Sequence, residues 1–436
     1  MMAQSGRGAT VITMRVALIF LILFVPAPAA VKAVRFGKLI DGDGTSRANA
    51  VVVIDGSRIR EVTTEIPAGA EVIDLSGFTG LPGLIDAHVH MTYYWDRAPG
   101  TRPFGQGGTR APAVTVFLAQ ENARRTLESG VTAVRDLGAS EGMSFAMRDL
   151  IERGAMQGPR LFVCGYGLSV GRSAPRPGVP IYPGQADGPG EVMRVARQQI
   201  AAGADWVKLF GSTGSGNDVS GRQTFTFDEM KAAVDAVHLL GKRVAIHSYG
   251  PAGARDAVRA GADSVEHAVD LDDDTLAEMA RRKTFYVPTI DHNRYYAEHA
   301  REFGYSDADV AALQAFIKRN VATAGRAHRA GVRFAMGSDA VFTMFGENAR
   351  ELEWLVQAGM TTAQAITTAT ANGAALLGVE DRSGRIAAGY DADLIAVAGD
   401  PLTDIRALTR AVRWVMKAGN VVVDKRRQAA SEVSIK

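Results

Sequence analysis

The chain has 436 residues, of which 47% are apolar and 22% charged, with 47 glycines and a formal net charge of +2. This is ordinary globular composition, which excludes disordered, collagen-like and coiled-coil proteins. The balanced charge and the absence of a basic run give no sign of a nucleic-acid partner. Because Cys164 is the only cysteine, an intramolecular disulfide and a cysteine-ligated zinc site are excluded, and any metal must be bound by histidine and carboxylate.

Residues 1–30 are predicted to be a secretory signal peptide. Residues 16–25 are apolar throughout, with Arg15 just before them and Ala27, Ala29 and Ala30 just after. A positive charge, a short apolar run and a small-residue cleavage site are the features of a secretory signal peptide, whereas a membrane span needs about 20 apolar residues. We therefore expect cleavage after Ala29 or Ala30, from a start at Met1 or Met14. The mature protein is expected to be secreted or periplasmic and not bound to a membrane.

Short strands are predicted at both ends of the mature chain. Residues 34–75 and 384–425 alternate apolar and polar positions and break at Gly and Asp. Between them lie eight short apolar runs, each followed by a helical pattern: 84–90, 131–138, 160–167, 205–211, 243–250, 263–268, 284–290 and 333–340. Eight consecutive strand–helix units predict an α/β fold with a (β/α)₈ barrel over residues 81–383. A doubly wound open sheet is the alternative.

Potential metal ligands lie at the ends of five of these runs. They are His88, His90, Lys208, His247, His267 and Asp339. Residues two apart on a strand face the same side, so His88 and His90 can reach one ion. Each residue alone has a structural explanation, since a strand histidine can pack in a core and Asp339 can cap the next helix. Their joint position at the carboxyl ends of barrel strands, where active sites of this fold lie, indicates a metal site.

The order His-x-His, Lys, His, His, Asp resembles the amidohydrolase superfamily. LPGLIDAHVH at 81–90, GSDA at 337–340 and GRIAAGYDADLIAVAGDPL at 384–402 are also typical of it. The resemblance is nearest to the prolidase-like dipeptidases related to imidazolonepropionase. It implies a small β-sandwich built from residues 31–80 and 384–436 of the two chain ends.

The same resemblance implies two divalent metal ions, expected to be Zn²⁺. His88, His90 and Asp339 would hold the buried ion, and His247 and His267 the outer one. Lys208, carboxylated by CO₂, would bridge both. A water shared by two ions loses a proton near neutral pH, and the bridging hydroxide would attack an amide carbonyl. Asp339 would then pass the proton to the leaving amine.

Other residues are predicted to contact the substrate. Tyr249 lies two residues beyond His247, so its phenol can donate to the developing oxyanion, although a packed core tyrosine is the alternative. Arg172 and Arg176, in the Gly/Pro-rich segment 165–190, can bind a substrate carboxylate, or else are solvated. His292, just past the seventh run, is expected to line the pocket.

One segment departs from the dipeptidase pattern. Those enzymes commonly have Gly-Gly-His after the third strand, where this chain has Val170-Gly171-Arg172-Ser173, which weakens the case for Xaa-Pro specificity. The predicted substrate is a dipeptide or an N-acyl amino acid. The first alternative is a cyclic amide, a lactone or an aromatic amide such as a mycotoxin. The second is a non-catalytic binding protein on the same fold, which is disfavoured because all six ligand positions are filled. Assembly into a homo-oligomer is left open.

Overall fold

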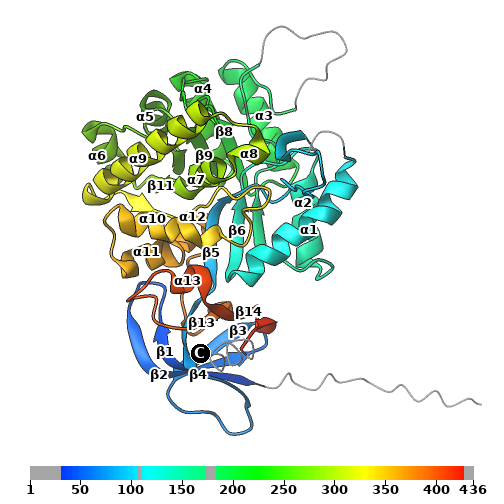
Figure 1. The fold of residues 1–436 in the computed structure, drawn as a ribbon, viewed down its shortest axis with the longest axis vertical. Coiled ribbons are helices and arrows are strands. Elements are labelled where there is room, and N and C mark those ends of the chain that lie inside the picture. The colour runs from blue at the N-terminus through cyan, green and yellow to red at the C-terminus, as the bar shows by residue number, and fades with distance from the viewer. Residues whose placement is uncertain (1–30, 106–109, 172–182, 427–436) are drawn as a thin grey trace, which may run out of the picture.

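The computed structural model describes residues 31–105, 110–171 and 183–426. The predicted signal peptide and the two predicted carboxylate-binding residues, Arg172 and Arg176, lie outside these ranges. No helix within the described ranges is both long enough and apolar enough to span a bilayer. Figure 1 shows two layers, a β-sheet at one end and a larger body of parallel strands wrapped by helices.

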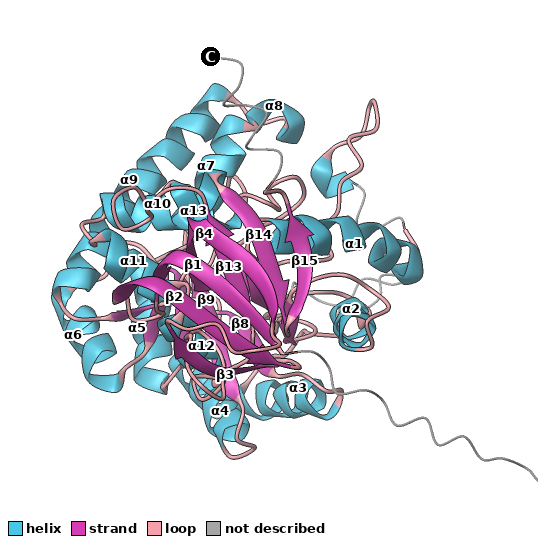
Figure 2. Cartoon of the chain, turned by 90° about the horizontal axis from the view of Figure 1, so that it is seen from below, coloured by secondary structure: helices cyan, strands magenta, loops and turns pink. Residues whose placement is uncertain are grey.

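The β-layer is one seven-stranded sheet made from both ends of the chain. Its order is β15-β14-β13-β4-β1-β2-β3. The bounds are β1 (Lys32–Ile40), β2 (Ser46–Asp55), β3 (Arg58–Thr63), β4 (Glu71–Pro82), β13 (Leu394–Val397), β14 (Val412–Lys417) and β15 (Asn420–Asp424). Leu394 pairs with Pro82 where antiparallel β13 joins β4. Figure 2 shows this sheet lying across the end of the helical body. A second facing layer, which a sandwich requires, stays a prediction.

This sheet has its own apolar core, which explains why its strands form where the alternation predicts them. Phe36 and Trp414 are fully buried in that core, one from each end of the chain. Gly80 is needed beside Phe36, because a Cβ at this position would come within 2.6 Å of the Phe36 ring. The two chain ends therefore depend on each other for burial.

Within the described residues, the body contains eight parallel strands in two sheets. One sheet has the order β5-β6-β7 and the other β12-β11-β10-β9-β8. The bounds are β5 (Leu84–Val89), β6 (Val131–Asp136), β7 (Arg160–Val163), β8 (Trp206–Phe210), β9 (Arg243–Ser248), β10 (Ser264–His267), β11 (Phe285–Val287) and β12 (Arg333–Phe334). Each of the eight predicted runs contains one of these strands, and the predicted α/β class is confirmed. Single parallel bridges, Val89 to Ala340 and Leu168 to Leu209, join the two sheets at both edges.

Helices alternate with these strands. They are α1 (Pro112–Glu128), α2 (Met143–Glu152), α3 (Pro189–Ala201), α4 (Phe227–His238), α5 (Pro251–Ala260), α6 (Asp273–Arg282), α7 (Ile290–Glu298), α8 (Ala300–Phe303), α9 (Asp307–Arg329), α10 (Glu351–Gln357), α11 (Thr362–Thr368), α12 (Ala371–Leu377) and α13 (Ala407–Arg410), with short 3₁₀ turns η1 (Pro103–Gly105) and η2 (Asn348–Arg350). Thr226 and Glu229 form a capping box at the start of α4, and Ser306 and Asp309 form one at the start of α9. Such boxes satisfy backbone N–H groups that have no partner within the helix.

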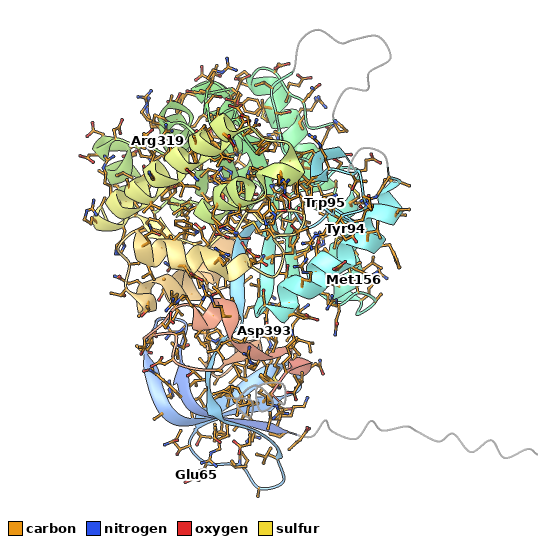
Figure 3. The ribbon with its side chains drawn as sticks, in the orientation of Figure 1. Glu65, Tyr94, Trp95, Met156, Arg319 and Asp393 are labelled. Carbon is orange, nitrogen blue, oxygen red and sulfur yellow. The ribbon has the colours of Figure 1, made fainter. Side chains whose placement is uncertain are left out.

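Charged side chains hold the sheet to the body. Figure 3 shows Asp393 at the junction between the two layers. Arg160, in β7, lies 3.3 Å from Asp393 and 3.1 Å from Asp391. Lys417 Nζ donates to the carbonyl oxygen of Gly158 over 2.6 Å. Because Arg160 and Gly158 belong to the body, these contacts fix the sheet at the ends of strands that are opposite to the predicted site.

Candidate metal centre

The six predicted ligands come together at the carboxyl ends of the parallel strands. His88 lies in β5, with His90 just after it, Lys208 lies in β8, and His247 and His267 lie in β9 and β10. Asp339 follows β12 directly. All are buried except His90, whose side chain is 11% exposed. Ligand atoms of His88, His267 and Asp339 lie within 4.8 Å of one another.

The carboxylate of Asp339 lies at the centre of this cluster, within ion-pair distance of three of its histidines. Its Oδ1 lies 3.2 Å from His90 Nε2 and 3.5 Å from His88 Nε2, and its Oδ2 lies 4.0 Å from His267 Nδ1. Two atoms that ligate one tetrahedral Zn²⁺ at about 2.1 Å are about 3.4 Å apart. The distances to Asp339 Oδ1 therefore fit a shared ion.

Two buried polar atoms of the cluster have no hydrogen-bond partner among the described residues. They are Asp339 Oδ1 and His247 Nε2. Such atoms are costly unless a ligand or a water satisfies them. Both belong to residues predicted to bind metal, so the donor set fits a cation.

His247 and His267 form the other side of the cluster. Their ring centroids are 4.5 Å apart, and Lys208 Nζ lies 3.5 Å from His88 Nε2. Burial and the charge of Lys208 hold the pKa of His247 well below its ordinary value, and burial and His247 do the same for His267. Neutral imidazole is the form that binds metals. Burial also lowers the pKa of the Lys208 ammonium.

Three residues at these strand ends have a strained, left-handed backbone. His267, Thr289 and Asp339 have φ values of 74°, 50° and 52°. Non-glycine residues adopt this left-handed region rarely, and it tends to occur at functional sites. Gly337 permits the close approach of this turn, because a Cβ there would lie 2.9 Å from the Cβ of His88.

A buried acidic residue that the sequence analysis did not select orients His88. Glu266 Oε2 lies 2.9 Å from His88 Nδ1, and Glu266 Oε1 accepts from Arg135 Nη2 over 2.9 Å. Both Glu266 and Arg135 are fully buried, and Arg135 also stacks on Trp206. Burial would raise the pKa of Glu266, but Arg135 and His88 outweigh it and bring the pKa to about 2. In the sequence, the only sign of this pair is that Arg135 and Glu266 each place one charge within an apolar strand.

Further hydrogen bonds orient the other ligands. His90 Nδ1 lies 3.1 Å from the carbonyl oxygen of Gly138, and His267 Nδ1 lies 2.6 Å from Thr289 Oγ1. Each leaves the Nε2 atom of the ring free to ligate. Thr289 was not selected from the sequence, and its side chain makes no cap hydrogen bond to α7.

The predicted substrate residues Tyr249 and His292 also reach the cluster. Tyr249 is 1% exposed, and its ring stacks on that of His247 with centroids 5.1 Å apart. His292, in α7, lies 3.3 Å from Asp339 Oδ2 through Nε2 and 2.8 Å from the Asp339 carbonyl oxygen through Nδ1. Burial would raise the pKa of Asp339, but His292, His88 and His90 hold it well below its usual range. His292 therefore contacts the predicted base itself.

Aromatic side chains from the surrounding loops and short helices border one side of the cluster. We call Tyr93, Phe104, Tyr296, Phe303 and Phe342 the aromatic belt. Its contacts run from His90 to Tyr93 (4.9 Å between centroids), to Phe342 (5.9 Å), to Phe104 (5.4 Å), to Tyr296 (6.1 Å) and to His292 (4.6 Å). Since His90 and His292 both contact Asp339, the belt closes a ring of side chains beside the predicted base. Phe104 is 54% exposed, so part of the belt faces solvent.

Comparison with known proteins agrees with this geometry. Residues 79–422 match the amidohydrolase family. Ochratoxinase of Aspergillus niger is 30% identical over 434 positions, covering 90% of this chain and 87% of that protein. Imidazolonepropionase of Kosmotoga olearia is 22% identical, covering 86% and 91%. The crystal structure of a Xaa-Pro dipeptidase with methionine bound in its active site superposes with a TM-score of 0.81 at 32% identity, covering 90% of this chain and all of that one.

These matches span nearly all of the described residues and include the loops that carry the cluster. They show that the chain is a hydrolase, which excludes the alternative of a non-catalytic binding protein. On this geometry and these matches, the chain belongs to the amidohydrolase family.

Proposed function

We propose that the chain is a binuclear metal-dependent amidohydrolase that cleaves an amide bond of a dipeptide or an N-acyl amino acid. The observation that carries the proposal is the pair of buried, unpartnered atoms Asp339 Oδ1 and His247 Nε2 within one cluster of predicted ligands. Membership of the amidohydrolase family supports it. Relatives in that family include a dipeptidase and an ochratoxinase.

The residues suit two divalent ions, which we propose to be Zn²⁺. His88, His90 and Asp339 would hold one ion, and His247 and His267 the other. Lys208 would bridge them as a carbamate. Carbamate formation needs a neutral amine, whose nitrogen attacks the carbon of CO₂ and then loses a proton. The lowered pKa of Lys208 favours that neutral form.

The side chains around the proposed ions would have separate roles in the reaction. Two bound divalent ions would lower the pKa of a shared water and polarise the substrate carbonyl. Asp339 would accept the proton of the attacking water and deliver it to the leaving nitrogen. His292 would hold that carboxylate in place through its two contacts with Asp339. The Tyr249 phenol, buried beside His247, would donate a hydrogen bond to the developing oxyanion.

The aromatic belt supports a more specific substrate. Aromatic side chains contact flat apolar groups with favourable offset or edge-to-face geometry. We propose that the group on one side of the scissile amide is an aromatic or other apolar ring, which an N-acyl amino acid can carry. An aromatic amide without a free carboxylate is the second candidate, favoured by the same belt. A cyclic amide or a lactone would form fewer contacts with the aromatic belt.

Three structural proposals accompany this function. We propose that the eight parallel strands form a closed barrel, which the single bridges at both sheet edges support. We propose that the sheet of the two chain ends is part of a small β-sandwich. We also propose export by the segment 1–30, which the sequence of that segment alone supports. A homo-oligomeric assembly stays a proposal without a supporting contact.

Metal analysis and substrate profiling test the function together. Purified protein should carry about two divalent ions per chain, lose activity on chelation and regain it with Zn²⁺. It should hydrolyse members of a panel of dipeptides and N-acyl amino acids. Active protein that holds one ion or none would contradict the binuclear proposal. Metal-loaded protein that cleaves only esters or cyclic amides would contradict the substrate proposal.

A further inference from the structure

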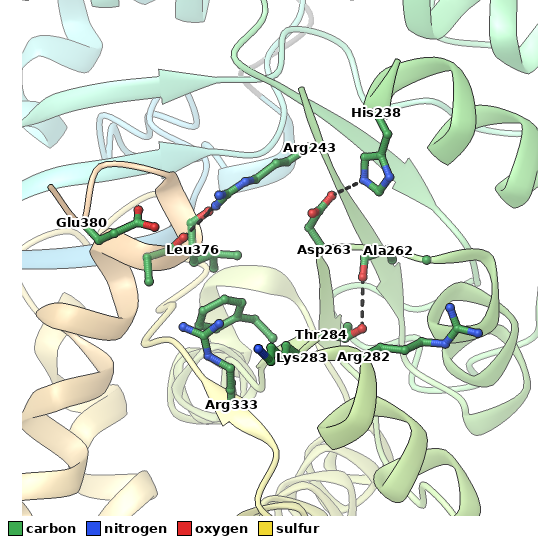
Figure 4. Close-up of a pocket in the computed structure, with 13 residues that line it drawn as sticks. His238, Arg243, Ala262, Asp263, Arg282, Lys283, Thr284, Arg333, Leu376 and Glu380 are labelled. Atoms are coloured by element: carbon green, nitrogen blue, oxygen red, sulfur yellow. Dashed lines mark hydrogen bonds and ion pairs between the residues drawn. The ribbon is translucent and has the colours of Figure 1, made fainter. Parts of the chain in front are cut away.

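A second pocket lies at the opposite ends of the strands from the metal centre. It has a volume of about 400 Å³ and is bordered by the first residues of β9, β11 and β12 and by the end of α12. Figure 4 shows Arg243, Lys283 and Arg333 around it, with Glu380 on one side. Arg243 and His247 are four residues apart on β9, which is about 13 Å along a strand. The pocket is therefore separate from the candidate metal centre.

Two of the charged residues that line this pocket, Asp263 and Arg282, already have partners. His238 Nε2 lies 2.8 Å from Asp263 Oδ2, an interaction that Figure 4 marks, and Asp263 Oδ2 also accepts from the backbone N–H of Val244. Arg282 donates to Glu278, outside the pocket. Asp263 and Arg282 therefore have partners, and their opposite formal charges cancel in the sum over the pocket.

Three other cations of the pocket have no such partner. Within the described residues, no carboxylate lies within 4.0 Å of Arg243, Lys283 or Arg333. Glu380, which is exposed, has no ion pair at that distance either. The three cations and this one carboxylate leave a net charge near +2 in one small pocket.

Arg333 is the cation least explained by the fold. Its guanidinium lies 4.1 Å above the centroid of the Phe285 ring and is half-buried. Its guanidinium makes no hydrogen bond or ion pair with another described residue. A partly desolvated guanidinium retains donors that match the oxygens of phosphate or carboxylate. Burial lowers the pKa of Arg333, although the charge of Glu380 acts in the opposite direction.

Arg243 has a structural role that accounts for only part of its donors. Its Nη1 donates to the carbonyl oxygens of Ala375, over 2.7 Å, and Leu376, at the end of α12. Cations are favourable at that end of a helix. This leaves Nε and Nη2 for another acceptor. In barrels of this kind the amino ends of the strands usually serve stability, which explains Arg243 but not Lys283 and Arg333 together.

We propose that this pocket binds a small dianionic oxyanion of the phosphate type, held by Arg243, Lys283 and Arg333. The net charge near +2 matches a dianion better than a single carboxylate. The volume suits a small ligand. Such a ligand would link α12, the turn after α6 and β12, and would stabilise the body at a distance from the metal centre. The proposal does not depend on the proposed function.

Calorimetric titration of the metal-loaded protein with inorganic phosphate, at constant ionic strength, tests the proposal. We expect binding in the millimolar range or tighter, and a rise in Tm of about 2 °C or more at saturation. Arg333→Ala and Lys283→Ala should each weaken binding by about tenfold, the loss expected for one charge-assisted hydrogen bond. Arg281→Ala, on the same α6 helix but paired with Glu278, is the matched control and should leave binding unchanged.

A gain of affinity separates binding from a merely structural role. Glu380→Gln removes the opposing charge and should tighten phosphate binding several-fold. Phosphate that binds at the metal centre instead would be lost on chelation and would be insensitive to Arg333→Ala. That result would overturn the proposal, as would equal effects of Arg333→Ala and Arg281→Ala. Acetate that binds as tightly as phosphate would overturn the assignment to a dianion. Hydrolase activity should be unchanged in all four variants.

Discussion

Glu266 Oε2 lies 2.9 Å from His88 Nδ1, and both side chains are buried. The pKa of Glu266 is about 2, so the acid is a carboxylate and His88 Nδ1 is the protonated nitrogen of a neutral ring. That tautomer leaves His88 Nε2, the atom that faces Asp339, as an acceptor for a metal. Glu266, which precedes the predicted ligand His267 in β10, therefore sets the tautomer of His88 in β5.

Glu266→Gln should weaken metal binding by about 10–100-fold, the usual effect of losing a carboxylate behind a ligating histidine. The amide can still contact His88 but no longer fixes its tautomer by charge. The measurement is metal affinity by competition with a chelator. Glu298→Gln, at an exposed position in α7, is the control. Unchanged affinity in Glu266→Gln would mean that His88 is oriented by packing alone.

Asp339→Asn should retain much of the metal while kcat falls by about 100-fold or more. The amide keeps the shape and one oxygen ligand but cannot accept a proton. Elemental analysis and steady-state kinetics on the same preparation separate the two effects. If kcat stays near that of the wild type with metal bound, the proton must pass through another residue. His292, 3.3 Å from the Asp339 carboxylate, would be the first to test.

The strands and the six proposed ligands could be predicted from the sequence because both follow simple periodic rules. Each parallel strand is buried on both faces, so it appears as a short apolar run. Parallel strands also bring their carboxyl ends to one edge, so polar residues at those ends must meet. His88 and Asp339 are 251 positions apart in the chain, yet their place at strand ends was enough to predict that they meet.

The supporting residues could not be predicted in the same way. Arg135 and Glu266 are each a single charge in an apolar strand, and which buried charges pair depends on side-chain directions across two sheets. The aromatic belt joins residues from separate elements, such as Phe104 in η1 and Tyr296 in α7, whose approach no local pattern encodes. His292 was expected only to line the pocket, and its contact with Asp339 depends on how α7 packs.

Lys208→Ala should lose bound metal and activity, because no other described side chain near His88 and His247 can supply a bridging anion after reaction with CO₂. Short carboxylic acids should restore part of the activity by occupying the space of the carbamate. Labelling with ¹³C-bicarbonate gives a direct measurement, since the wild type should show a carbamate signal that Lys208→Ala lacks. Lys231→Ala, at an exposed position in α4, is the control. A free ammonium at Lys208 in metal-loaded crystals would contradict this prediction.

Phe104→Ala should lower kcat/KM for an N-acyl amino acid with an aromatic acyl group by about tenfold, while an aliphatic analogue changes much less. Phe104 is 54% exposed, so its truncation should not disturb folding. Phe117→Ala is the matched control, because Phe117 is 68% exposed in α1 and lies outside the aromatic belt. Equal losses for the aromatic and aliphatic substrates would show that the belt does not select the substrate.

Lys417→Met should change how stability depends on pH. Burial lowers the pKa of Lys417 from 10.5 to about 8 in the folded state. Between these two values the unfolded chain binds more protons at this site, so the site adds to stability as pH rises through that window. The variant lacks this pH-dependent contribution to the free energy of unfolding. Relative to the wild type, its free energy of unfolding should therefore fall by about 1–3 kcal/mol between pH 7.5 and 10.5. Thermal unfolding at several pH values measures the difference, with Lys231→Met as the exposed control. A difference that stays constant across the window would mean that Lys417 remains charged and solvated at the junction of the sheet and the body.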